Sequence, residues 1–164
     1  MCGLPFSGKT TLAKELEKQL LFDRVDIDEI KAEHGFGDKS DDKISHEDWV
    51  KIFEDMDNRL IFLMKQKKGI ISDISNLEKS DRNHLRELAA KFNYPTYVIY
   101  LNTPAKIARQ RWLENQETKK RFDLTEKVFY EAVESLEEPT EDENVIVLDY
   151  KQSVDDWVKT LSSH

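Results

Sequence analysis

Short apolar runs alternate along this chain with longer segments in which apolar residues recur every three or four positions. The run at 97–101 is apolar throughout, as expected of a strand that is covered on both faces. The run at 24–28 instead alternates polar and β-branched residues, which also favours a strand. We predict strands at 24–28, 70–73, 97–101 and 144–149.

The segments between these runs have the spacing of amphipathic helices. Leucines at 12, 16 and 20 mark one face of a helix near the start of the chain. A longer helix begins near Ser45, where Asp48 follows at the spacing of a capping box. Its apolar positions are interpreted as core and not as a ligand site: Trp49, Ile52, Phe53, Met56, Leu60 and Leu63. Further helices are predicted near 79–92, 104–114, 125–136 and 152–162.

Strands that alternate with helices of this length are typical of an α/β fold. We predict a three-layer α/β/α sandwich, in which a parallel sheet lies between two layers of helices. We see no repeat and no linker, so one domain over 1–164 is expected. In such sheets ligands bind at the carboxyl ends of the strands, which is where candidate functional residues are sought.

The most specific chemical signal precedes the first predicted helix. Residues 3–10 read GLPFSGKT, which matches the phosphate-binding P-loop pattern G-x-x-x-x-G-K-[ST]. The backbone N–H groups of such a loop surround the phosphates of a nucleotide, its lysine reaches the β- and γ-phosphates, and its hydroxyl residue binds Mg²⁺. The sequence therefore predicts a site for ATP and Mg²⁺ made by Gly3, Leu4, Pro5, Phe6, Ser7, Gly8, Lys9, Thr10 and Thr11.

A P-loop normally follows a buried strand of about five apolar residues. Here only Met1 and Cys2 precede Gly3. Two interpretations are open: the first strand is reduced to a stub, or residues upstream of this sequence have been lost.

Carboxylates stand at the predicted ends of two strands. Asp26 and Asp28 close the strand predicted at 24–28, and Asp73 closes the strand predicted at 70–73. Phosphoryl transfer needs a carboxylate that takes the proton of the acceptor hydroxyl, and often another that holds Mg²⁺. We assign Asp28 to the first role and Asp73, with Thr10, to the metal; Asp26 is the weaker candidate. The alternative is that these aspartates only cap strand ends or helices.

A basic segment at about 109–124 is predicted to form a helical lid. A lid that closes over the phosphates would stabilise the transferring charge and exclude water. Arg111 and Arg121 are the candidate lid residues, whereas Lys119 and Lys120 are interpreted as part of a solvated helix face. The acidic stretch 137–143 is interpreted as a solvated loop, and the four histidines have no metal-ligand spacing.

Composition narrows the function classes. The net charge of −8 argues against broad attraction to nucleic acid, although it leaves room for a local basic site. The single cysteine permits no internal disulfide, and no signal peptide or long apolar run is present. We therefore expect a cytoplasmic protein with no membrane partner; no feature predicts its oligomeric state.

Taken together, these motifs resemble the polynucleotide-kinase-like P-loop kinases, a group that lies near gluconate kinases and zeta toxins. The matching segments are 3–11, 25–31, 70–77 with Arg82, 109–115 with Arg121, and 138–143. The resemblance implies that Asp28 is the general base, that Lys31 lies near the acceptor, and that Arg111 or Arg121 is the lid arginine. The acceptors of this family differ widely, so the resemblance does not name one.

Three functional hypotheses follow. The first is an ATP-dependent phosphotransferase that acts on a hydroxyl of a small molecule or nucleoside. The second is a kinase for the 5′ end of RNA or DNA, against which the net charge counts. The third is an ATP-binding switch or ATPase without an acceptor. Asp28 separates the third from the others, because a switch needs no base for an acceptor hydroxyl.

Overall fold

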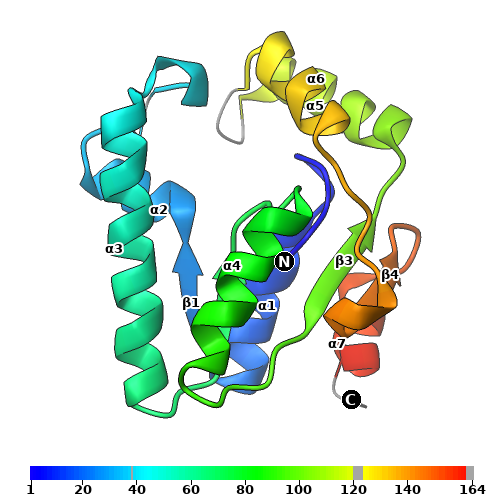
Figure 1. Ribbon diagram of the computed structural model, residues 1–164. Helices are drawn as coiled ribbons and strands as arrows, with labels where there is room; N and C mark the ends of the chain where they lie inside the picture. Colours follow the sequence, from blue (N-terminus) through cyan, green and yellow to red (C-terminus); the bar gives the residue numbers. More distant parts are fainter. Residues whose placement is uncertain (38, 120–123, 162–164) are drawn as a thin grey trace.

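The computed structural model describes residues 1–37, 39–119 and 124–161 (Figure 1). Its strands are β1 (Asp23–Asp26), β2 (Ile70–Asp73), β3 (Val98–Asn102) and β4 (Val145–Asp149). Its α-helices are α1 (Lys9–Leu20), α2 (Ile27–Glu33), α3 (His46–Lys65), α4 (Lys79–Ala90), α5 (Ala105–Thr118), α6 (Glu126–Glu134) and α7 (Val154–Leu161). Short 3₁₀ turns are η1 (Asp41–Lys43) and η2 (Glu141–Glu143). The four predicted strands and six predicted helices occur in the predicted order, and helix α2 is an additional element.

The first two residues of the chain lie between two parallel pairs of strands. β1 pairs with β2, and β3 pairs with β4, in both cases in parallel. The backbone nitrogen of Met1 donates to Ser72 O over 3.0 Å, and Cys2 N donates to Ile99 O over 2.8 Å. Met1 and Cys2 thus lie between β2 and β3, so the order is β1, β2, residues 1–2, β3, β4. The P-loop therefore leaves the middle of the sheet.

The prediction of a strand over 24–28 is wrong at its carboxyl end. The strand ends at Asp26, and helix α2 begins at Ile27. Asp26 is the N-cap of this helix, since its Oδ1 accepts a hydrogen bond of 2.8 Å from Asp28 N. Because an aspartate satisfies the free N–H groups of a first turn, it allows a strand to pass directly into a helix. Asp28 consequently lies in the first turn of α2.

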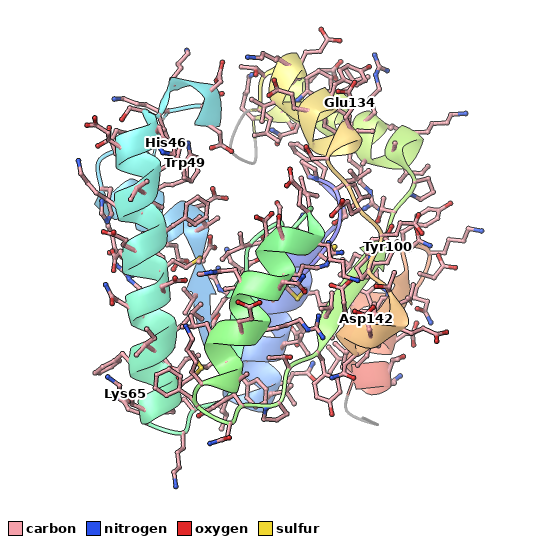
Figure 2. The ribbon with its side chains drawn as sticks, in the orientation of Figure 1. His46, Trp49, Lys65, Tyr100, Glu134 and Asp142 are labelled. Carbon is pink, nitrogen blue, oxygen red and sulfur yellow. The ribbon has the colours of Figure 1, made fainter. Side chains whose placement is uncertain are left out.

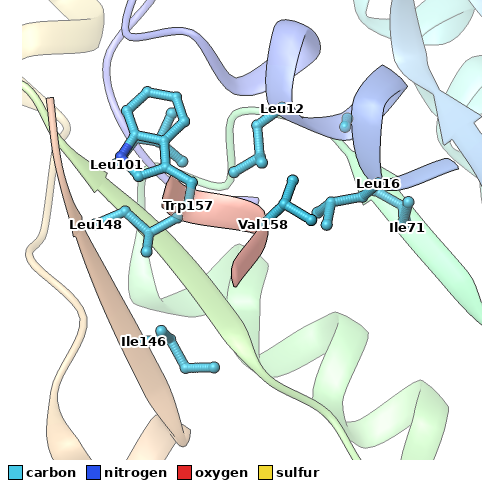
Figure 3. Close-up of a cluster of buried hydrophobic side chains, with 9 residues drawn as sticks. Leu12, Leu16, Ile71, Leu101, Ile146, Leu148, Trp157 and Val158 are labelled. Atoms are coloured by element: carbon cyan, nitrogen blue, oxygen red, sulfur yellow. The ribbon is translucent and has the colours of Figure 1, made fainter. Parts of the chain in front are cut away.

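Helices cover both faces of the sheet, as predicted for a three-layer sandwich. On one face α1 and α7 bury a cluster that includes Leu12, Leu16, Leu101, Trp157 and Val158 (Figure 3). On the other face α3 and α4 pack around a second cluster. On strand β2, Ile71 belongs to the first cluster and its neighbour Ile70 packs against the second. This alternation along β2 follows from the two-residue period of a strand.

The buried face of α3 differs from the predicted one at Phe53. Ile52, Met56 and Leu60 are buried as predicted, but Phe53 faces outward and is 45% exposed. Its ring stacks on that of Trp49, with centroids 5.4 Å apart. Figure 2 places Trp49 near the beginning of α3, at the opposite end from Lys65. Helical periodicity identified the apolar stripe, but not which edge of the stripe the sheet covers.

The prediction of a solvated loop over 137–143 is wrong at Glu143. This carboxylate is 0% exposed and accepts hydrogen bonds from Arg82 Nε over 2.6 Å and from Arg82 Nη2 over 3.1 Å. Arg82 Nη1 also donates to Leu77 O over 2.9 Å and to Asn76 O over 3.2 Å. A bidentate pair of this kind ties α4 to η2 and to the loop that follows β2.

Helices α5 and α6 pack against each other beside the P-loop (Figure 1). The rings of Trp112 and Phe129 stack with centroids 5.3 Å apart, and Leu4 of the P-loop joins the same cluster. Residues 109–118 of the predicted lid segment lie in α5. Across the described ranges, we find no helix with both the length and the apolar character needed to cross a bilayer.

Candidate functional site

The P-loop has the backbone conformation that its glycines permit. Gly3 and Gly8 have φ values of 136° and 111°, which side chains rarely adopt. A Cβ atom on Gly3 would also lie 2.9 Å from Leu101 O. Gly8 is the N-cap of α1, so the loop passes directly into the helix whose N-terminus carries the positive end of its dipole. The predicted loop over 3–10 is therefore formed.

Two polar groups inside this loop fit the binding of phosphate. Lys9 Nζ donates to Gly3 O over 2.8 Å and to Leu4 O over 2.9 Å, so the ammonium group spans the loop. Ser7 Oγ is buried and has no hydrogen-bond partner among the described residues. A phosphate oxygen held by the loop would supply an acceptor for such a hydroxyl.

The two predicted metal ligands are brought together. Thr10 Oγ1 on α1 donates to Asp73 Oδ1 at the end of β2 over 3.4 Å. These are oxygen donors, as Mg²⁺ prefers, and Mg²⁺ usually takes only one or two protein ligands beside water and phosphate. In the part of the chain that the structure describes, no group of three or more His, Cys, Asp or Glu side chains forms a larger metal cluster. The pair therefore fits a magnesium ion carried by a nucleotide.

Arg24 is a residue of this site that sequence reasoning missed. Its side chain is 6% exposed, and its Nη1 lies 3.2 Å from Asp73 Oδ2 and also pairs with Asp26. The guanidinium further binds Glu29 on α2 and Glu17 on α1. Burial, together with the charge of Asp26, raises the pKa of Asp73 above its usual range. Arg24 thus holds Oδ2 of Asp73, while Oδ1 of the same carboxylate accepts from Thr10.

The predicted base, Asp28, lies in a second charged group. Its carboxylate is 66% exposed, and Oδ1 lies 3.4 Å from Lys31 Nζ one turn later on α2. Lys31, which is 3% exposed, also binds Asp41 on η1, and its ammonium stands 5.7 Å from the ring centroid of Trp49. Partial burial raises the pKa of Asp28, as do the charges of Asp26 and Asp41, whereas Lys31 lowers it. The carboxylate is therefore accessible and more basic than an ordinary aspartate.

The candidate lid residue Arg111 contacts the P-loop from helix α5. Arg111 on α5 donates from Nη1 to Phe6 O and to Ser7 O, each over 3.2 Å. Arg121, Lys120 and the rest of 120–123 lie outside the described residues. A pocket of about 500 Å³ adjoins Arg111 and opens onto the loop. Its lining includes Gly8, Thr11, Asn115, Tyr150, Gln152 and Trp157.

This arrangement has relatives among known proteins. The AAA domain family matches this chain over residues 1–139. The chain belongs to the AAA domain family. A thymidylate kinase of Staphylococcus epidermidis is 45% identical over 49 residues, which are 30% of this AAA-domain chain and 24% of the enzyme. The match thus spans about a quarter of that relative.

Solved structures show the same fold over nearly the whole AAA-domain chain. A sugar kinase from Janibacter is 20% identical, with a TM-score of 0.71 over 99% of this chain and 90% of its own. A gluconokinase from Sinorhizobium meliloti is 17% identical, with a TM-score of 0.65 over 96% and 85%. The APS kinase of Mycobacterium tuberculosis, in complex with AMPPNP and APS, is 15% identical, with a TM-score of 0.69 over 99% and 92%. The predicted resemblance to P-loop kinases near the gluconate kinases is confirmed.

Proposed function

We propose that this AAA-domain chain transfers the γ-phosphoryl group of ATP to a hydroxyl of a small molecule or nucleoside. The contact between Thr10 Oγ1 and Asp73 Oδ1 carries the proposal, because it unites residues 63 positions apart at the end of the P-loop. The kinase folds described above support it, and one of them was solved with an ATP analogue.

In the proposed reaction the P-loop amides and Lys9 bind the β- and γ-phosphates. Thr10 and Asp73 would hold Mg²⁺, which neutralises charge that develops on the phosphate oxygens. Asp28 takes the proton of the acceptor hydroxyl. The oxygen of that hydroxyl bonds to the γ-phosphorus, and the bond between the γ-phosphorus and the bridging oxygen of the β-phosphate breaks. ADP and the phosphorylated acceptor are the products. Arg111, and Arg121 if the lid brings it near, would stabilise the charge on the transferring group.

A polynucleotide kinase and an ATP-dependent switch are the two alternatives. The net charge of −8 disfavours the first, because neutralising a nucleic-acid backbone takes clustered Lys and Arg. The accessible, basic carboxylate of Asp28 disfavours the second, since a switch has no acceptor hydroxyl to deprotonate. A screen that measures ADP release from ATP over a panel of hydroxyl compounds tests the proposal.

Nucleotide binding is expected to stabilise the protein through Lys9. Mg·ATP at ~100 times its dissociation constant should add about 2.7 kcal/mol to the free energy of unfolding. The Lys9→Ala variant should lose most of this gain, because the ammonium that spans the loop is gone. Thermal denaturation with and without Mg·ATP measures the effect. Lys14→Ala, at an exposed position of the same helix, is the matched control and should keep the full gain.

Asp73→Asn is expected to raise the Mg²⁺ concentration that the reaction needs. The amide keeps the shape of the side chain but removes the charge that would attract the metal, so transfer at low Mg²⁺ should slow about tenfold and recover in part at high Mg²⁺. A Mg²⁺ titration of ADP release measures this. Asp23→Asn on β1, whose partner Lys68 lies at the surface, is the control. Equal titration curves for wild type and Asp73→Asn would contradict the metal assignment.

A further inference from the structure

The charges around Asp28 restrict which acceptors the proposed reaction can use. Lys31 contacts the Asp28 carboxylate directly, and it is the residue that the family resemblance puts near the acceptor. Its ammonium is held between two carboxylates, Asp28 and Asp41, and the side chain is almost completely covered. An incoming anion would therefore meet two negative groups before it reached this cation.

Three arginines elsewhere in the chain are paired with carboxylates in the same way. Arg24 is surrounded by the carboxylates of β1, β2, α1 and α2, as described above. Arg59 on α3 pairs with Glu33 and Asp55, and Arg82 pairs with the buried Glu143. Each of these arginines already has an anionic partner inside the protein. At the P-loop, Lys9 and Arg111 are the cations that the proposed reaction uses for ATP.

We propose that the acceptor carries no phosphate or carboxylate group and is an uncharged or amine-bearing hydroxyl compound. The inference rests on the proposed function and names the substrate class of the same site. An anionic acceptor would need to displace Asp28 or Asp41 from Lys31, and would be repelled by the second carboxylate at short range. An uncharged hydroxyl compound meets no such barrier, and an amine would be attracted to Asp41.

The assignment has a direct consequence for the role of Lys31. By binding Asp28 it keeps the base in one orientation, and it is a positioning residue in this proposal. It does not bind the acceptor. Asp41 offsets part of the charge of Lys31, so Lys31 lowers the pKa of Asp28 less than it would alone. This agrees with the raised pKa of Asp28.

An anion-binding experiment tests the proposal without knowledge of the acceptor. Inorganic sulfate is added to the full chain saturated with Mg·AMPPNP, so that the P-loop is already filled, and the melting temperature is recorded. Asp41→Ala removes one carboxylate from Lys31, whereas Asp42→Ala removes the next carboxylate of η1, which binds Ser40 and not Lys31. Comparing the two variants cancels the general stabilisation by sulfate.

Asp41→Ala is expected to gain about 2–4 °C more from sulfate than Asp42→Ala and wild type. The proposal is overturned if wild type itself shows a specific sulfate shift that Lys31→Met abolishes, because Lys31 would then be open to anions.

Matched acceptors supply the second arm. Two sets of acceptors are compared. The first contains glucose, glucosamine, gluconate and glucose 6-phosphate, and the second contains adenosine and AMP. Within each set the uncharged or amine-bearing member should have a kcat/KM at least about tenfold higher than its anionic counterpart. Preference for an anionic member overturns the inference while supporting phosphotransfer. Absence of transfer to every hydroxyl compound tested, with Mg·ATP still bound, overturns the proposed function, whereas the sulfate result still decides whether Lys31 accepts anions.

Discussion

Replacing Arg82 with methionine is expected to lower the free energy of unfolding by about 3–5 kcal/mol, the usual cost of removing one partner of a buried ion pair. The Glu143 carboxylate would be left 0% exposed without its cation. Two backbone acceptors, Asn76 O and Leu77 O, would also lose their donor. Methionine replaces the unbranched stem of arginine but not its guanidinium group, so the loss combines an unpaired charge, missing hydrogen bonds and the space left by the head group.

Urea denaturation followed by circular dichroism measures this change. Lys79→Met is the matched control: Lys79 lies three residues earlier on α4 and pairs with Asp142, the neighbour of Glu143, but this pair is at the surface. Surface pairs contribute little, so the denaturation midpoint of the control should stay close to that of wild type. If Arg82→Met and Lys79→Met had the same midpoint, the buried pair would not be a major source of stability.

The elements that could be predicted from the sequence are those encoded by neighbouring residues. The P-loop is a run of eight residues, and its glycines determine its backbone wherever the rest of the chain lies. The strands at 70–73 and 97–101 were found from apolar runs for the same local reason. Helix α2 was missed because Val25 and Ile27 alternate with polar residues, which is the period of a strand, and the cap at Asp26 falls inside that pattern.

Residues whose role depends on distant partners were harder to predict. The pairing of Thr10 with Asp73 followed from a rule of the fold, since carboxyl ends of parallel strands meet at one edge. No such rule indicated that Glu143, in an acidic run, is buried by an arginine 61 residues earlier. Arg24 was likewise missed, because its carboxylate partners come from separate elements that only the folded chain brings together.

Asp28→Asn is expected to lower the rate of phosphoryl transfer by a factor on the order of 10²–10⁴ while ATP binding changes little. The amide keeps the size of the side chain and can still accept a hydrogen bond at its oxygen, but it cannot take the proton of the acceptor hydroxyl. In wild type, kcat/KM should fall as the pH drops through the pKa of Asp28, which lies above that of an ordinary aspartate.

Transfer is measured with the acceptor that the screen identifies, and ATP binding by the thermal shift with Mg·ATP. Glu33→Gln removes a carboxylate from the other end of α2, where it pairs with Arg59, and should leave transfer unchanged. Full transfer by Asp28→Asn would exclude Asp28 as the base and direct attention to Asp26. That residue is a poorer candidate, because its carboxylate is buried, bound to Arg24 and engaged as the cap of α2. A proton acceptor must reach the substrate, and of the two aspartates Asp28 has the more accessible carboxylate.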